Sequence, residues 1–152
     1  MRVVFLPGSG GDGRFWRPLA ARLPADWTLR FLDWPGLGDV PPAADVNRFD
    51  DLVRLALRAI DGPVDLVAQS TGVVVALRIA LERPDLTDRL ADVHADTLLV
   101  WGEADRISPP AVGRELARLL PHAELVVISG GDHALARDRA AEVAPHVVRH
   151  LA

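Results

Sequence analysis

The chain has 152 residues, of which 49% are hydrophobic and 25% charged, with a formal net charge of −4 and no cysteine. This length is typical of one domain, so we expect a single domain over residues 1–152, and the apolar content excludes a disordered chain. The absence of cysteine excludes disulfides and thiolate metal sites, and the negative charge argues against a nucleic-acid-binding surface.

Short strand-like runs alternate along the chain with segments of helical periodicity, a pattern typical of βα units around a parallel sheet. The predicted strands are residues 3–6, 28–33, 64–68, 97–101 and 125–129. Helical spacing of apolar residues predicts helices at 15–23, 52–60, 72–81, 112–120 and 140–151. We expect Asn47 or Asp50 to cap the second helix, and the third to be buried on most sides because it is apolar nearly all round.

Right-handed crossovers between these elements favour a doubly wound, five-stranded parallel sheet of order 2-1-3-4-5, with helices on both faces. Arg30 and Glu124 mark the second and fifth strands as the edges, where a charge discourages further pairing. Ligands of such sheets bind beyond the carboxyl ends of the strands. Functional residues are therefore expected in the loops at residues 7–13, 68–72, 102–108 and 129–134.

The third predicted strand leads into Ala68-Gln69-Ser70-Thr71-Gly72, directly before a predicted helix. A serine in such a turn projects from a tight corner, and small residues two positions to either side let the backbone pass closely. The usual pattern is Gly-x-Ser-x-Gly, with Ala68 here in place of the first glycine. Ser70 is thus a candidate nucleophile, and the alternative is that it caps the following helix.

Two further residues typical of hydrolytic chemistry follow the fourth and fifth predicted strands, namely Asp105 and His133. An imidazole can take the proton of a serine hydroxyl near neutral pH, and a carboxylate orients the imidazole. Serine, aspartate and histidine in this order, each after a strand on one sheet edge, predict a catalytic triad. Glu103 and Asp132 are alternatives for the acid, and Asp105 could instead be a loop carboxylate without a catalytic role.

Several segments resemble the alpha/beta hydrolase family, and together they extend over almost the whole chain. They are Val3–Gly11, Asp33–Gly38, Gly102–Asp105 and Gly131–His133, together with Trp16. The segments look like the family's oxyanion segment, its Asp-x-Pro-Gly-x-Gly loop, its acid loop and its catalytic histidine loop. The resemblance implies a serine hydrolase without cofactor or metal, with Ser70, Asp105 and His133 as catalytic residues.

The tetrahedral intermediate of such a reaction requires two N–H donors aimed at its oxyanion. Chemistry and resemblance together predict the backbone N–H groups of Ser9 and Thr71. The Thr71 N–H lies at the start of a predicted helix, whose dipole favours negative charge.

Only residues 84–96 separate the third predicted helix from the fourth strand, too few for a further strand with its crossover or for a helical cap. We therefore expect a truncated alpha/beta-hydrolase fold without a cap. Strands 64–68 and 97–101 should pair directly, and 85–93 should form a short helix or a loop. The site should be open, and the candidates for its apolar, substrate-binding rim are Trp34, Leu37, Ile107 and Leu135.

These features predict a carboxylesterase-like serine hydrolase that cleaves small esters with short acyl chains. Alternatives on the same triad are a thioesterase, a lactonase or a perhydrolase, and an alternative of another class is a weakly catalytic or non-catalytic scaffold. No apolar run approaches the roughly 20 residues that span a bilayer, and the apolar N-terminus is too short for a secretory signal. We expect a cytoplasmic protein whose exposed apolar surface leads to a homo-oligomer.

Overall fold

The computed structural model describes residues 1–60, 62–81 and 93–152, and these residues form two compact units. Residues 1–17 and 24–81 belong to the first unit, and residues 18–23 and 93–152 to the second. The predicted short helix or loop at 85–93 lies outside the described residues except for Val93, whose side chain is buried. No helix in the described ranges is long and apolar enough to cross a bilayer.

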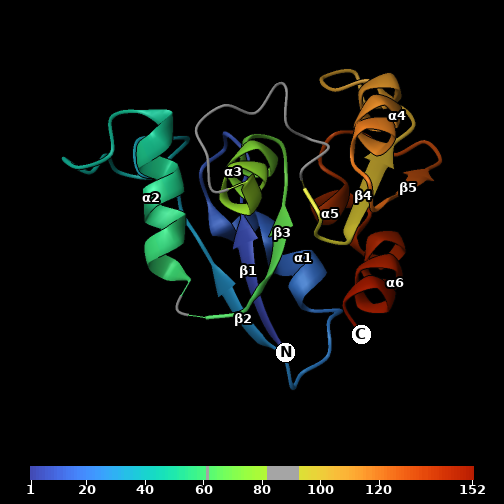
Figure 1. Cartoon of the computed structure of the whole chain (residues 1–152), viewed down its shortest axis with the longest axis horizontal. Coiled ribbons are helices and arrows are strands. Elements are labelled where there is room, and N and C mark those ends of the chain that lie inside the picture. The colour runs from blue at the N-terminus through green and yellow to red at the C-terminus, as the bar shows by residue number, and fades with distance from the viewer. Residues whose placement is uncertain (61, 82–92) are drawn as a thin grey trace. The chain divides into compact units, whose positions relative to one another are not determined.

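The first unit contains a parallel three-stranded sheet of β1 (Arg2–Leu6), β2 (Thr28–Phe31) and β3 (Asp65–Ala68), in the order β2-β1-β3 (Figure 1). The central strand β1 is an apolar run buried from Val3 to Leu6, as expected for a strand covered on both faces. Arg30 lies on the edge strand, as its charge predicted, and its Nη1 donates to Ala59 O at 2.7 Å.

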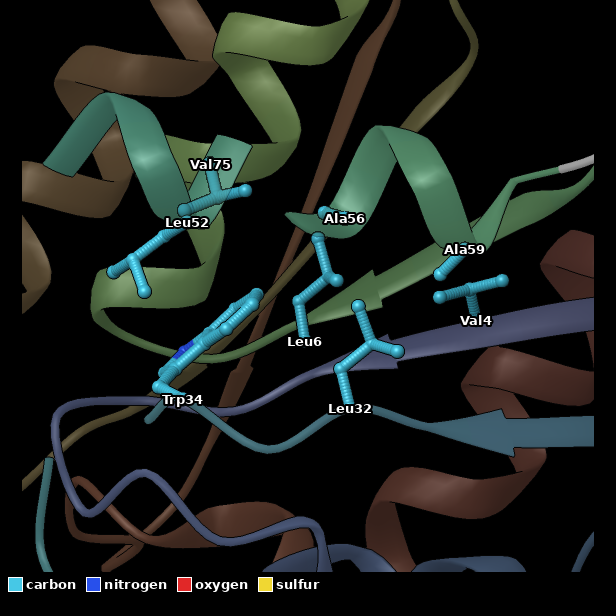
Figure 2. Packing of buried hydrophobic residues seen from close by; sticks show 8 residues of the cluster. All are labelled: Val4, Leu6, Leu32, Trp34, Leu52, Ala56, Ala59 and Val75. Carbon is cyan, nitrogen blue, oxygen red and sulfur yellow. The ribbon is translucent and has the colours of Figure 1, made fainter. Parts of the chain in front are cut away.

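Helices α2 (Phe49–Ala59) and α3 (Thr71–Leu81) pack on one face of this sheet. Figure 2 shows the buried cluster between them, formed by Val4, Leu6, Leu32, Trp34, Leu52, Ala56, Ala59 and Val75. Successive side chains of a strand point to opposite faces, so Phe5 lies on the other face, where its ring centroid is 5.3 Å from that of Trp16. The alternation of side chains along β1 thus places Val4 and Leu6 on the face that contains Trp34.

Three details of the predicted helices are wrong. The helix expected at 15–23 is a 3-10 turn, η1 (Gly13–Trp16), followed by a short helix, α1 (Arg17–Ala20). Pro18 has no N–H to donate to the preceding turn, which accounts for the division. Helix α3 was expected to be buried on most sides, but most of its side chains are half-buried, and Val74 is 41% exposed.

The third wrong prediction concerns the N-terminus of α2, because neither Asn47 nor Asp50 caps this helix. The N-cap is Arg48, and Asp51 reaches back to accept hydrogen bonds from the N–H groups of Asn47 (2.6 Å) and Arg48 (2.8 Å). An acidic residue at the third helical position can satisfy the free N–H groups at the helix start, and the carboxylate of Asp51 is also paired with Arg54.

The second unit contains two parallel strands, β4 (Thr97–Gly102) and β5 (Ala123–Ile128), with Leu99 opposite Leu125. Its helices are α4 (Pro110–Leu119), α5 (Leu135–Asp138) and α6 (Ala140–Leu151). Helix α5 was not predicted, since four residues are too few to show a helical period. Helix α4 packs on β4 through Gly113, where a Cβ atom would lie only 2.7 Å from the ring of Trp101.

The α/β class and the parallel neighbours 2-1-3 and 4-5 are confirmed. The described strands form two parallel sheets, one in each unit. The direct pair expected between the third and fourth strands would join the two units, so it stays a prediction.

Several large apolar side chains are exposed in the described residues, among them Ile107 at 75% and Leu57 at 48%. Such residues are compatible with the self-association expected from the sequence, which stays a prediction.

Candidate active site

Ser70 occupies the turn between β3, which ends at Ala68, and α3, which begins at Thr71. Its φ is 50°, and it is the only residue other than glycine with a positive φ in the described ranges. The left-handed region is costly for an L-residue, and such conformations cluster at functional sites. The strand-to-helix corner predicted for this serine is therefore present, with Ser70 at its strained position.

The alternative that Ser70 serves as a helix cap does not fit the structure. A capping hydroxyl would accept from the N–H of Gly72 or Val73. These groups instead donate to backbone carbonyls, Gly72 N–H to Gln69 O and Val73 N–H to Ser70 O, both at 2.9 Å. The hydroxyl of Ser70 is thus not engaged in holding the helix start.

Glycines let the loop after β1 lie directly against this turn. A Cβ atom on Gly72 would lie 2.3 Å from Leu6 O, and one on Gly8 would lie 2.2 Å from Gln69 Oε1 and 3.1 Å from Ser70 Cβ. At Gly72 only a residue without a side chain fits, because the atoms it meets belong to the backbone, whereas the atom nearest to Gly8 is the movable end of the Gln69 side chain. The small-residue requirement that the sequence pattern suggested is therefore a consequence of close backbone packing.

The two predicted oxyanion donors flank this packing within the first unit. Thr71 N–H is at the start of α3, where the helix dipole favours negative charge, and Ser9 follows Gly8. Within the described part of the chain, no hydrogen-bond acceptor engages either N–H group.

In the second unit, His133 Nδ1 lies 2.8 Å from Asp105 Oδ2. The Asp105 side chain is 6% exposed and that of His133 is 20% exposed. The other carboxylate oxygen of Asp105 accepts from the N–H groups of Ile107 (2.9 Å) and Ser108 (2.8 Å). Burial alone would raise the pKa of Asp105, but these hydrogen bonds from Ser108, His133 and Ile107 outweigh it and hold the pKa below its ordinary value.

Neither alternative acid takes the position of Asp105. Glu103 Oε2 accepts from Ser129 Oγ at 2.8 Å and from Gly130 N–H at 2.9 Å, so it connects the loop after β4 to the loop after β5. Asp132 Oδ1 accepts from the backbone N–H of His133 at 2.7 Å. Asp105 is therefore the carboxylate that orients the imidazole.

The acid loop and the histidine loop are joined by backbone contacts as well. Ala104 N–H donates to Gly131 O at 2.8 Å and Glu103 N–H to Ile128 O at 3.0 Å, while a Cβ atom on Gly102 would lie 2.4 Å from Gly131 O. The bridging contact of Glu103 was not foreseen, because it depends on a loop that is distant in the sequence. Only the parallel β4–β5 pair brings the two loops together.

Two of the four candidate rim residues have buried side chains, and the rim assignment stays a prediction. Trp34 is 0% exposed and belongs to the core cluster, and Leu135 is 8% exposed. An aromatic or aliphatic residue next to a functional loop can point to the core or to the substrate, and the sequence alone does not distinguish the two. Leu37 is half-buried, and Ile107 is 75% exposed.

Comparison with known proteins identifies the family of this chain. Residues 3–86 match the alpha/beta hydrolase family, and residues 79–152 match a family described as TAP-like protein. The first match covers more than half of the chain. The chain belongs to the alpha/beta hydrolase family.

One curated relative is the pimeloyl-[acyl-carrier protein] methyl ester esterase of Neisseria meningitidis serogroup C, 32% identical over an alignment of 117 residues that covers 74% of this chain and 44% of the relative. The chain spans less than half the length of such relatives. Among solved structures, a lipase-esterase related protein from Clostridium acetobutylicum aligns with a TM-score of 0.85 at 13% identity, covering 98% of this chain and 93% of that one. The thioesterase domain from the curacin biosynthetic pathway aligns with a TM-score of 0.81 at 16% identity, covering 97% and 90%. Both structural likenesses concern the fold alone.

Proposed function

We propose that this chain is a serine hydrolase that cleaves small carboxylic esters through Ser70, His133 and Asp105. The observation that carries the proposal is the contact between Asp105 Oδ2 and His133 Nδ1 at 2.8 Å. A proton on Nδ1 that is donated to the carboxylate places the lone pair of the ring on Nε2, the atom that a general base requires.

In the proposed mechanism, Ser70 Oγ attacks the ester carbonyl carbon while His133 Nε2 takes the hydroxyl proton. The carbonyl oxygen becomes an oxyanion that accepts from the N–H groups of Ser9 and Thr71. The bond to the leaving alcohol then breaks, and His133 returns the proton to that alcohol. Water attacks the acyl-enzyme in a second, equivalent step that releases the acid and restores Ser70, while Asp105 holds the imidazole throughout.

Two findings support this proposal without deciding the substrate. A relative at 32% identity is named a methyl ester esterase, and Ser70 has the strained backbone of a turn that exposes a nucleophile. Thioesters, lactones and peracid formation would use the same groups, so they belong in the substrate panel as alternatives.

The proposal is tested by labelling the full chain with a fluorophosphonate probe. We expect one adduct per chain, located on the peptide that contains Ser70, and no adduct on the Ser70→Ala variant or on heat-denatured protein. Such a probe phosphonylates a serine only when a neighbouring base activates it. If the folded wild-type chain remains unlabelled, the protein is the non-catalytic scaffold. If Ser70→Ala is still labelled, Ser70 is not the nucleophile.

A second expectation concerns acyl-chain length. The 13 residues 84–96 are too few to supply a helical cap, and Ile107, the most exposed of the large apolar side chains described, is 75% exposed next to Asp105. With little apolar surface to enclose a long acyl chain, kcat/KM for acetate and butyrate esters should exceed that for esters of ten or more carbons. Initial rates over a series of p-nitrophenyl esters measure this, and a higher kcat/KM for the long chains would contradict an open site.

A further inference from the structure

We propose that Trp34 is a positioning residue for the oxyanion loop, defined here as residues 7–11. Its side chain and its backbone hold the two ends of this loop, so that Ser9 N–H is directed to the position where it can act as a donor. The inference rests on the proposed function, because it explains what holds Ser9 N–H, one of the two proposed oxyanion donors, in place.

The side chain of Trp34 holds the first end of the loop. Its indole ring is fully buried, and Nε1 donates to Pro7 O at 2.6 Å. A buried hydrogen bond of this kind is costly to break, because the carbonyl would lose its partner without gaining water. A trans peptide is planar, so a carbonyl held toward Trp34 directs the N–H of Gly8 to the opposite side.

The backbone of Trp34 holds the second end. Trp34 N–H donates to Gly11 O at 2.7 Å, and Gly11 N–H in turn donates to Gly8 O at 3.0 Å. Gly8 O and Ser9 N–H belong to the same peptide plane and point in opposite directions. Fixing Gly8 O toward Gly11 therefore fixes Ser9 N–H on the other side of the loop, away from Gly11.

Close glycine contacts lock the oxyanion loop against the residues that follow Trp34. Gly11 has a φ of 74°, and a Cβ atom there would lie 2.3 Å from Leu37 O. A Cβ atom on Gly38 would lie 2.0 Å from Gly10 O. The two loops therefore interlock at van der Waals distance, and the loop cannot shift while the segment around Trp34 stays in place.

The locked loop also contacts the nucleophile turn, since a Cβ atom on Gly8 would lie 3.1 Å from Ser70 Cβ. A donor that is misaligned with the developing oxyanion loses part of its effect, because hydrogen-bond strength falls with misalignment. The hydrogen bond of Trp34 thus bears on the reaction without the residue touching the substrate.

Trp16 provides a matched control within the same unit. It is 2% exposed, and its Nε1 is buried with no hydrogen-bond partner among the described residues. Trp16→Phe and Trp34→Phe remove the same atoms from two buried sites, but only Trp34→Phe removes a hydrogen bond to the oxyanion loop. The difference between the variants isolates that bond.

The experiment compares both variants in the full chain with a short-chain ester. Loss of a whole oxyanion donor lowers kcat by about 10²–10³-fold, and a displaced donor should lose part of that effect. We expect Trp34→Phe to lower kcat about 10-fold or more relative to Trp16→Phe, with KM changed less than about twofold, because the bond acts mainly in the transition state. Urea unfolding checks that the two variants have lost similar stability.

Amide hydrogen exchange gives a readout that is independent of activity. Exchange at Gly11 N–H should accelerate in Trp34→Phe and not in Trp16→Phe. If Trp34→Phe does not fold, 3-benzothienylalanine in place of Trp34 keeps the ring shape and removes only the N–H donor. Equal kcat in the two phenylalanine variants, or unchanged exchange at Gly11, would overturn the inference. Failure of the proposed function is recognised separately, because the wild-type chain would then not be labelled by the fluorophosphonate probe.

Discussion

Ser70→Ala and His133→Ala should each lower kcat for an acetate ester by about 10⁴-fold or more, and the double variant should be no slower than either single variant. Nucleophile and base act as one unit, since a serine hydroxyl without a base is a weak nucleophile and a base without a nucleophile has no proton to take. The losses are therefore not additive. Steady-state hydrolysis of a chromogenic ester measures all three variants.

His122→Ala is the control for the histidine variant. His122 is an exposed residue directly before β5, and the bond that its backbone carbonyl accepts from Thr97 N–H does not depend on its side chain. Its substitution should leave kcat within about twofold of the wild type. Additive losses in the double variant would mean that Ser70 and His133 do not act in one step, which contradicts the proposed mechanism.

Asp105→Asn should lower kcat by a similar factor, about 10⁴-fold, while the protein stays folded. The amide oxygen of asparagine can still accept from the N–H groups of Ile107 and Ser108, so the loop keeps its shape. Its NH₂ group, however, donates to His133 Nδ1 and forces the ring proton onto Nε2, which removes the base. Steady-state rates measure the loss, and circular dichroism checks the fold.

Glu103→Gln is the matched control, because a glutamine oxygen can still accept from Ser129 and Gly130. This variant should stay within about tenfold of the wild type. A large loss in Glu103→Gln together with a small loss in Asp105→Asn would show that Glu103, and not Asp105, is the catalytic acid.

The Asp105→Asn variant also tests the lowered pKa of Asp105. A carboxylate whose pKa is lower in the folded state stabilises the fold above its unfolded pKa, about 3.9, and that contribution is lost as the pH falls through the lower folded value. The free energy of unfolding of the wild type should therefore fall below about pH 4 more steeply than that of Asp105→Asn. Urea unfolding between pH 6 and pH 3 measures both curves, and parallel curves would contradict the shift.

Local patterns in the sequence determined most of the secondary structure. All five predicted strands are present within a few residues of their expected ends, because apolar runs bounded by loop residues are a local property. The corner at Ser70 was likewise predictable, since a serine between small residues at a strand-to-helix junction leaves the backbone few conformations. Chain order also indicated that Asp105 and His133 follow neighbouring strands.

Other features were decided only by the tertiary structure. Nothing local distinguishes Asp105 from Glu103 or Asp132, and the choice follows from how the β4–β5 pair places two loops against each other.

Trp34 shows the physical reason most plainly. In the sequence it is an aromatic residue in a loop that resembles a family motif, and both a substrate contact and a core residue fit that description. The folded chain surrounds its ring with β1, α2 and α3 and brings Pro7 O to its Nε1. Residue type and spacing determined where helices, strands and reactive groups lie along this chain. The direction of each side chain depended on contacts between distant segments, which exist only once the core has packed.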